Sequence, residues 1–259
     1  MIKLNFVSAF WRDRFKASGI HLGISVVIAL LAAVLVFGVW YPYPYREISG
    51  GRELFLIVVM VDVILGPLIT LAVFNRAKPW QELRRDLAMV ALIQLSALGY
   101  GLWTVFVARP VHMVFEYDRF RVVHAIDVPL ELLPKVPRDV DALPLMGPTL
   151  LSLRPFRNNQ ENMDATFAAL QGVSLSSRPD LWQRYGAATP EILKAARPVV
   201  AFKTRFVMQA AAIDEALARV GRQPETVVYL PMVGRKSVWT VFLDPVTAEV
   251  LAFVPLDSF

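Results

Sequence analysis

The stretch ELFLIVVMVDVILGPLITLAVF, residues 53–74, holds a run of apolar residues long enough to cross a lipid bilayer. A transmembrane helix needs about 20 apolar residues to span roughly 30 Å of hydrocarbon. Asp62 lies near the middle of this run, where an acidic residue costs roughly 2.5–3.5 kcal/mol on insertion scales. Because an acid at this depth is costly, the sequence marks Asp62 as the first candidate for a functional role.

Two further apolar runs accompany this one. The three runs cover about residues 18–40, 54–74 and 87–107, and no comparable run follows them. Hydrophobic residues make up 56% of the 259 residues, which is too many for an ordinary soluble domain. The first run lacks a small-residue cleavage site after it, so we interpret it as a retained anchor. The sequence predicts an integral membrane protein with three transmembrane α-helices in residues 18–107 and a separate domain in residues 108–259.

The distribution of basic residues predicts how the helices are oriented. The N-terminal tail carries four basic residues against one acid, and the loop after the second run carries four against two. The loop after the first run has equal numbers of both. By the positive-inside rule, the tail and the second loop face the cytoplasm. A third span then places the C-terminal domain on the outer side of the membrane, which is the periplasm if the membrane is a bacterial inner (cytoplasmic) membrane.

The segments at the two ends of the first run are predicted to contact lipid headgroups. Residues 1–17 are predicted to form a cytoplasmic, basic, amphipathic tail with Phe6 and Phe10 in the interface. At the outer end, WYPYPY, residues 40–45, is typical of an aromatic belt whose prolines end the helix. The formal net charge of +5 lies almost entirely in the cytoplasmic segments, so it indicates lipid contact and not nucleic-acid binding.

Residues 108–259 are predicted to form a small α+β periplasmic domain with an antiparallel sheet. Alternating apolar residues in 110–124 predict one long strand or a tight hairpin around Asp118-Arg119. The proline-rich residues 127–160 lack a clear periodicity and indicate a long connection or an extended face. Three apolar segments after Thr226 predict an antiparallel meander. Helices are predicted in residues 161–172, 191–197 and 203–221.

The sequence gives no positive indication of an enzyme. It has no Walker, dinucleotide-binding, G-x-S-x-G or H-E-x-x-H motif, and it has no cysteine. His112 and His124 lie near Asp118 and Asp127, but a zinc site needs three or four converging ligands and nothing fixes a third. We interpret both histidines as half-buried strand residues, and we expect no catalytic activity, no cofactor and no metal.

Three roles are open for Asp62. It can be a structural contact inside the helix bundle, with Tyr100 as the hydrogen-bond donor at a similar depth and Gln94 too far toward the inner side. It can relay protons, which would require further acids or histidines along a path. It can lie in a groove that receives a partner's transmembrane helix bearing a positive or hydrogen-bonding group. The pair Gly66-Pro67 is predicted to kink the helix and free a backbone carbonyl beside it.

Residues 14–128 resemble a known family over most of their length. The resemblance includes the D-x-x-x-G-P of Asp62 to Pro67 and the E-L-R-R-D-L of Glu82 to Leu87. On these segments the chain is similar to the TfpX/TfpZ family of type IV pilin accessory proteins. That family consists of inner-membrane proteins that are encoded beside particular major pilins and needed for the assembly of those pilins. No enzymatic residues are assigned to it.

The resemblance implies a role in type IV pilus (fimbrium) biogenesis, in which the protein binds or stabilises a cognate major pilin and promotes its assembly into pili. Type IV pilins wait in the inner membrane as one apolar helix with a periplasmic head. On this hypothesis the partner-binding residues are Asp62, Gly66, Pro67 and Tyr100, and the outer domain contacts the head. Other assembly-platform proteins are further candidate partners, in addition to the lipid bilayer.

Two other function classes stay open. A membrane-anchored periplasmic ligand-binding or sensor protein would need an apolar pocket with a few polar groups in residues 108–259. It would also need a cytoplasmic output element, and the loop after the second run is too short to be one. A membrane-bound pilin-modifying enzyme would need clustered polar residues at the outer membrane face, where the sequence offers only balanced charges.

Overall fold

The structure is a computed structural model that describes the backbone from Ile2 to Phe259 and the side chains from Phe10 onward. The chain forms two compact units. The helical unit comprises the chain up to Val39 together with Gly51–Val107, and the sheet domain comprises Trp40–Gly50 together with Ala108–Phe259.

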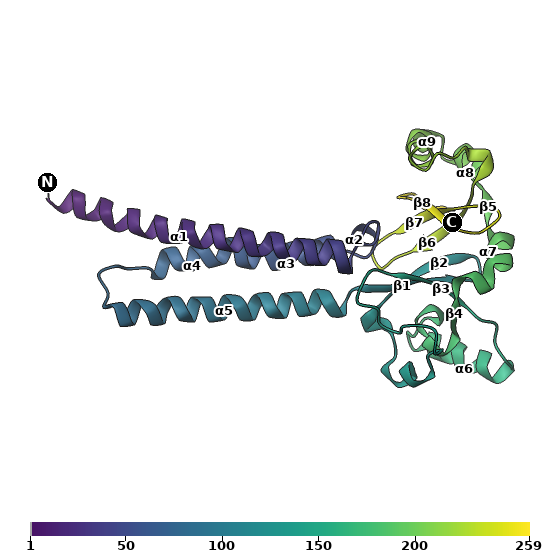
Figure 1. Ribbon diagram of the computed structural model, residues 1–259, viewed down its shortest axis with the longest axis horizontal. Coiled ribbons are helices and arrows are strands. Elements are labelled where there is room, and N and C mark those ends of the chain that lie inside the picture. Colours follow the sequence, from purple (N-terminus) through teal and green to yellow (C-terminus); the bar gives the residue numbers. More distant parts are fainter. Residues whose placement is uncertain (1) are drawn as a thin grey trace. The chain divides into compact units, whose positions relative to one another are not determined.

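The helical unit contains the three apolar runs as three long helical segments. Within this unit α1, α3–α4 and α5 lie side by side (Figure 1). All three segments are long and apolar enough to cross a membrane, which confirms the three predicted runs as helices. The backbone before residue 18 is helical and continuous with the first segment, while the predicted interfacial position of Phe6 lies outside the described side chains. The bounds are α1 (Ile2–Leu35) followed by a π-helical turn (Val36–Trp40), α3 (Gly51–Met60), a second π-helical turn (Val61–Leu65), α4 (Gly66–Val73) and α5 (Trp80–Val107).

The irregularity predicted at Gly66-Pro67 takes the form of the π-helical turn Val61–Leu65. Pro67 has no backbone N–H, so the carbonyl of Val63 lacks its normal helical donor. The wider π-helical turn lies directly before the proline and contains Asp62. Such π-bulges are rare and occur frequently at functional sites.

The sheet domain is built on one mixed sheet in which the strands follow the order β4-β3-β1-β2-β6-β7-β8, with β5 paired to β6. Neighbours β1 and β3 are parallel, as are β2 and β6, so the prediction of an antiparallel sheet is wrong. The α+β class and the antiparallel meander β6-β7-β8 are confirmed. The strands are β1 (Pro110–Glu116), β2 (Arg119–His124), β3 (Thr149–Leu153), β4 (Trp182–Arg184), β5 (Arg197–Pro198), β6 (Val228–Val233), β7 (Val238–Leu243) and β8 (Val250–Val254).

The hairpin alternative for residues 110–124 is the one that forms. Strands β1 and β2 pair antiparallel around Tyr117 and Asp118, and Tyr117 takes a positive φ of 57°. Because β1 is paired with β2 and β3 on its two edges and is buried along nearly its whole length, His112 is fully buried and not half-buried. The parallel strand β3 lies inside residues 127–160, for which the sequence left a long connection or an extended face open.

The segment Trp40–Gly50 is part of the core of the sheet domain. Tyr41 and Tyr45 are buried, so the predicted aromatic belt at the lipid surface is wrong for these two side chains, and Ile48 is buried with them. The Tyr45 hydroxyl lies 3.5 Å from Met113 Sδ, and the Ile48 carbonyl accepts a hydrogen bond from the Lys236 N–H at 3.0 Å. The short helix α2 (Tyr45–Ile48) places these residues.

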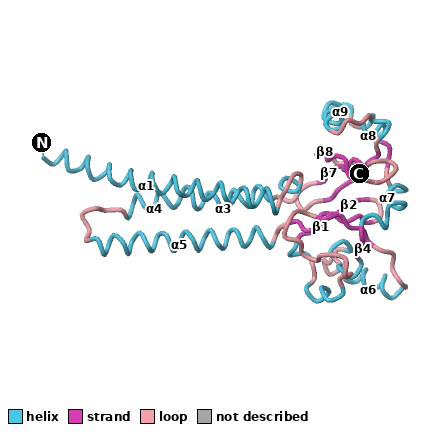
Figure 2. Tube along the Cα trace, viewed as in Figure 1, coloured by secondary structure: helices cyan, strands magenta, loops and turns pink. Residues whose placement is uncertain are grey.

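Three helices of the sheet domain lie toward the two ends of its strand order, while Ile192 of α7 belongs to the core cluster of the central strands. Helices α8 and α9 lie beside the β8 end and α6 beside the β4 end (Figures 1 and 2). The predicted single helix in residues 203–221 is wrong, because the chain leaves helical geometry at Phe206. The break lets α8 bury Phe202 and α9 bury Ile213 in one cluster with Tyr229 and Phe242. The bounds are α6 (Asn159–Leu170), α7 (Thr189–Ala195), α8 (Val199–Arg205) and α9 (Ala210–Arg219).

Candidate functional site

Polar side chains from all three spanning segments gather inside the helical unit, three of them buried and His21 half-buried. We call His21, Asp62, Thr70 and Gln94, together with Gly66 beside them, the bundle polar cluster. His21 Nδ1 on α1 lies 2.5 Å from Thr70 Oγ1 on α4, and both Asp62 and Gln94 are less than a tenth exposed. Polar groups in a membrane span are costly, so their convergence on one interior site indicates a function.

Gly66 is the point where the three segments meet. A Cβ atom at this position would clash with the carboxamide of Gln94, 2.8 Å from its Cδ, and would lie 3.1 Å from His21 Nε2. Glycine therefore lets α4 approach both side chains. One residue later, the Pro67 carbonyl accepts a hydrogen bond from Ser18 Oγ at 2.9 Å. Gly66 and Pro67 thus hold α1 and α4 together.

Asp62 has an unsatisfied oxygen in this environment. The carboxylate is 7% exposed, and its buried Oδ1 has no hydrogen-bond partner among the residues described. His21 is near enough to act on it electrostatically. A buried carboxylate oxygen without a donor is destabilising, so Asp62 can accept a hydrogen bond from a group that this chain does not supply.

Tyr100 is not the donor for Asp62 that the depth comparison predicted. Its side chain is 73% exposed, while Gln94, which was judged too far inward, is 8% exposed and lies against Gly66. The sequence reasoning also missed His21 and Thr70. Counting residues from the start of the first run and from the end of the second run would have placed these two at similar depth, because the two segments run in opposite directions.

An apolar groove opens beside the bundle polar cluster. It has a volume of about 400 Å³ and lies between α1, α4 and α5. His21 and Thr70 are the polar residues among its lining side chains, while Ile20, Ile24 and Val90 contribute to its apolar walls. The groove therefore exposes His21 and Thr70 of the bundle polar cluster along an apolar surface.

The sheet domain has its own, larger cavity. It measures about 510 Å³ and is lined mainly by apolar side chains, among them Phe115, Tyr117, Phe156 and Leu181, with Glu191 as a polar contribution. Ligand pockets commonly have volumes of about 300–1,000 Å³ and mostly apolar walls. The cavity therefore meets one requirement of the ligand-binding alternative.

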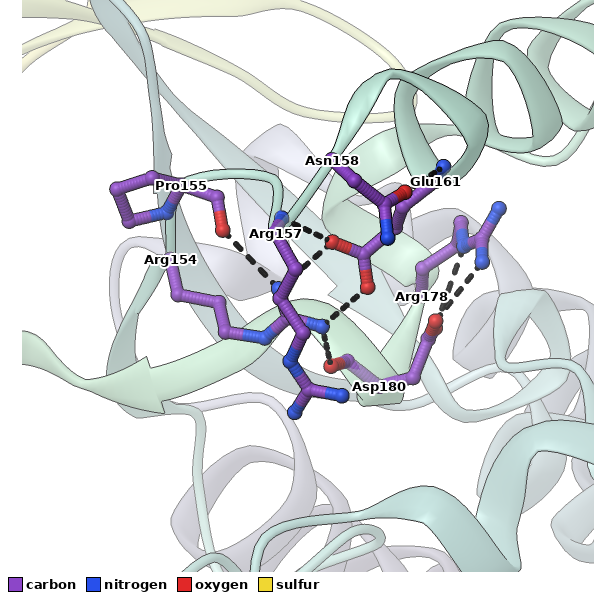
Figure 3. Close-up of polar contacts among 7 residues, drawn as sticks. All are labelled: Arg154, Pro155, Arg157, Asn158, Glu161, Arg178 and Asp180. Atoms are coloured by element: carbon purple, nitrogen blue, oxygen red, sulfur yellow. Dashed lines mark hydrogen bonds and ion pairs between the residues drawn. The ribbon is translucent and has the colours of Figure 1, made fainter.

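An ion-pair network beside this cavity fixes α6 (Figure 3). Arg154 donates to both oxygens of Glu161, at 2.9 and 2.6 Å, and to the carbonyls of Pro155 and Asp180. The hydrogen bonds from Arg154 lower the pKa of Glu161 to about 2. Asn158 caps the helix by accepting from the Glu161 N–H at 2.8 Å. Because every acidic oxygen here has an internal donor, we interpret this network as structural.

The two strand histidines do not form a metal site. Nδ1 of His112 lies 2.7 Å from the Thr149 hydroxyl and Nε2 donates to the Ala142 carbonyl at 3.0 Å, and burial lowers its pKa to about 4. Nδ1 of His124 lies 3.2 Å from Asp127 Oδ2. In the described part of the chain, no three histidine, aspartate or glutamate side chains converge as metal ligands.

Together these features define a class of protein that has three helices long enough to span a membrane, a polar site between them and a mixed-sheet domain. A family model described as fimbrial assembly protein FimB matches residues 9–50. The fimbrial assembly proteins of serogroups I and E1 from Dichelobacter nodosus are each 36% identical over 246 residues, which cover 94% of this chain and 95% of theirs. The protein of serogroups C1 and C2 is 42% identical over 120 residues, covering 46% of this chain and 92% of its own.

The chain therefore belongs to the family of fimbrial assembly proteins. This membership confirms that the protein has a role in fimbria biogenesis, as the sequence resemblance implied. No solved structure matches the chain.

Proposed function

We propose that the protein is an inner-membrane accessory protein of type IV pilus biogenesis, of the TfpX/TfpZ kind, that binds a cognate major pilin and promotes its assembly. The observation that carries this proposal is the unsatisfied carboxylate oxygen of Asp62 inside a bundle of three apolar helices. A partner helix that supplies a hydrogen-bond donor would satisfy this oxygen and bury the surrounding apolar surface at the same time.

The proposed orientation follows from the charge of the connecting segments. The short connection between α4 and α5 carries Arg76 and Lys78, and Lys78 pairs with Asp86 at 2.6 Å. With this end in the cytoplasm, the sheet domain lies in the periplasm, where the head of a membrane-embedded pilin would also lie.

The depths of Asp62, His21 and Thr70 in the membrane favour the groove as the route by which the pilin helix approaches. The amino end of a membrane-embedded pilin is expected near the cytoplasmic face, whereas Asp62 lies toward the outer half of its span. His21 and Thr70 line the groove on the cytoplasmic side of Asp62. A pilin helix in the groove would therefore meet His21 and Thr70 with its first turns and Asp62 farther along.

The other proposed partner-binding residues have distinct roles. Tyr100 lies on the exposed surface of α5, where it can contact the pilin helix directly. Gly66 and Pro67 are buried, so they act by positioning α4 beside α1. The relatives are named by serogroup, which supports a protein that is matched to one type of fimbria.

Asp62→Leu tests the proposal. Photo-crosslinking from α1, α4 and α5 in host membranes, followed by mass spectrometry, should capture the major pilin with the unaltered protein and not with the variant. The variant should remain inserted and equally abundant. Asp62→Asn keeps a carbonyl oxygen as acceptor and is the matched control, expected to retain much of the capture. Loss of the Asp62→Leu variant from the membrane would instead identify a structural role for Asp62. Crosslinking of the unaltered protein that captures no pilus component would contradict the proposal.

A periplasmic ligand-binding protein is the second candidate function. The cavity lined by Phe115 and Tyr117 favours it. The cytoplasmic connection speaks against it, because only six residues separate Val73 from Trp80 and leave no room for an output element. Crosslinking that captures no pilus component from any helix would make this candidate the leading one.

A further inference from the structure

A polar cleft opens in the sheet domain where β6 ends and β2 continues. Strands β2 and β6 pair at Phe120 with Met232 and at Arg121 with Val233. Beyond this point β6 turns at Gly234, while β2 runs on to His124. The cleft has a volume of about 430 Å³ and belongs entirely to the sheet domain. Nothing in the proposed interaction of the helical unit uses it.

The cleft is lined by more hydrogen-bond donors than acceptors. Arg121 and Arg235 supply guanidinium groups, and Ser174 and Ser177 supply hydroxyls. Asp127 is the carboxylate among the lining residues. Planar guanidinium groups match the geometry of carboxylate and phosphate oxygens, so this composition favours an anionic ligand.

Asp127 is already engaged by its neighbours, so the residues that line the cleft present two guanidinium groups and one carboxylate that is already paired. Arg235 Nη2 donates to both Asp127 oxygens, at 2.9 and 3.0 Å. Burial alone would raise the pKa of Asp127. The hydrogen bond from His124 and the charge of Arg235 outweigh this effect, so the pKa is lowered overall and the Asp127 carboxylate stays ionised. Arg121 Nε lies 3.5 Å from Glu116 Oε2, and both atoms lack a hydrogen bond. Because both atoms are buried, a ligand would contact Arg121 through the rest of its guanidinium group, since 35% of the side chain is exposed.

His124 adds an acceptor. It is 1% exposed and lines the cleft, and its Nε2 has no hydrogen-bond partner in the part of the chain that the structure describes. Burial lowers the pKa of His124, so the ring is neutral at pH 7, and its Nδ1–H points to Asp127. A neutral imidazole with Nδ1 protonated has a lone pair on Nε2. That lone pair requires an O–H or N–H donor.

We propose that this cleft binds an oxyanion that carries a hydroxyl group, of the phosphate or phosphomonoester class. The anionic oxygens accept from Arg121 and Arg235, and the hydroxyl donates to His124 Nε2. An oxyanion without a proton would leave the buried Nε2 unsatisfied, which makes the site selective for the protonated kind.

Phosphate and sulfate test this selectivity on the unaltered protein. Both are tetrahedral oxyanions of similar size, but at pH 7 phosphate retains a P–OH group and sulfate has no proton. Isothermal titration calorimetry on the full-length protein in a maltoside detergent, which contains no phosphate of its own, should show phosphate binding at least tenfold more tightly than sulfate. Equal binding of both anions would overturn the role of His124, and absence of phosphate binding at millimolar concentration would overturn the site.

Arginine variants locate the site. Arg121→Gln and Arg235→Gln should each weaken phosphate binding at least tenfold. Arg222→Gln is the matched control, because Arg222 also pairs with an aspartate, at 3.0 Å, and its side chain is 42% exposed against 41% for Arg235. An equal loss in Arg222→Gln would show non-specific attraction and overturn the proposal.

The source of the phosphate is distinguished in a further titration. Glycerol 3-phosphate carries the phosphomonoester of a lipid precursor as well as free hydroxyls. Tighter binding of glycerol 3-phosphate than of inorganic phosphate would identify an organic phosphomonoester as the ligand. Weaker binding would identify the free inorganic ion. Both results support the site, and both are independent of whether the helical unit binds a pilin.

Discussion

Gly66 on α4 lies directly against the carboxamide of Gln94 on α5. A Cβ atom on Gly66 would lie 2.8 Å from Gln94 Cδ and 3.1 Å from His21 Nε2, which is closer than atoms in folded proteins normally approach. The three spanning segments therefore meet at one position that only glycine occupies without displacement. This contact links the packing of the bundle to the polar groups beside Asp62.

Gly66→Leu should destabilise the helical unit by about 1–3 kcal/mol, the usual cost of overpacking a close contact. Gln94→Ala removes the group that the new side chain would strike. The double variant should therefore be more stable than the sum of the two single changes predicts. Thermal unfolding in detergent measures this coupling, and strictly additive effects would contradict the contact between the two residues.

Gly101 and Gly99 offer a matched pair on α5. A Cβ atom on Gly101 would lie 2.7 and 2.9 Å from the two methyl carbons of Val58 on α3, whereas a Cβ atom on Gly99 would meet nothing within 4 Å. Because Val58 is β-branched and stiff, it cannot move its methyl groups away at low cost. Gly101→Ala should lower the unfolding temperature in detergent and Gly99→Ala should leave it unchanged. The reverse order would place α3 against a different face of α5.

The elements that could be predicted from sequence are those fixed by local pattern. The three spans could be predicted because each contains about 20 consecutive, mostly apolar residues, a length that is typical of transmembrane helices. The β1-β2 hairpin and the β6-β7-β8 meander follow from period-two alternation interrupted by turn residues. Helix α6 follows from its periodicity, and the Asn158 cap completes it.

The elements that could not be predicted depend on contacts between distant parts of the chain. Strand β3 lies in a proline-rich segment and pairs parallel with β1, where Met113 lies opposite Leu150. Because these two residues are far apart in the sequence, no local sequence pattern indicates the pairing. The burial of Tyr41 and Ile48 in the sheet domain has the same origin. At the bundle polar cluster, the sequence shows that Asp62 is a polar residue inside an apolar helix, but it does not show which side chains Asp62 faces. The π-helical turn before Gly66 rotates the residues on its two sides relative to each other, and this rotation cannot be read from the sequence.

Ile48→Ala tests whether the segment between the first two spans supports the sheet domain. Ile48 is fully buried, and it lies against Gly234 at the turn between β6 and β7. Truncating a buried isoleucine to alanine costs about 2–5 kcal/mol, so the urea midpoint of the sheet domain should fall clearly. Val246→Ala in the exposed turn before β8 is the control and should change the midpoint little. An unchanged midpoint in Ile48→Ala would show that the segment is not part of the core.

His112 should make the stability of the sheet domain depend on pH between about 4 and 6.5. Burial lowers the pKa of His112 from 6.5 to about 4, because the charged ring would lose its hydration. Above pH 6.5 the ring is neutral in both the folded and the unfolded protein, so the full stability is present. As the pH falls through this window, the unfolded state takes up the proton first, and folding loses up to about 3 kcal/mol.

The variant His112→Gln isolates this contribution. Glutamine can still donate to the Ala142 carbonyl and accept from the Thr149 hydroxyl, but it does not titrate. Its free energy of unfolding in urea, followed by the fluorescence of the tryptophans, should depend less on pH in this window than that of the unaltered protein. Glu161, whose pKa in the folded state is about 2, and His124 are present in both proteins, so their contributions cancel in the difference. Identical slopes for the two proteins would mean that His112 takes up its proton in the folded state as readily as in the unfolded one, which would contradict its burial between Thr149 and Ala142.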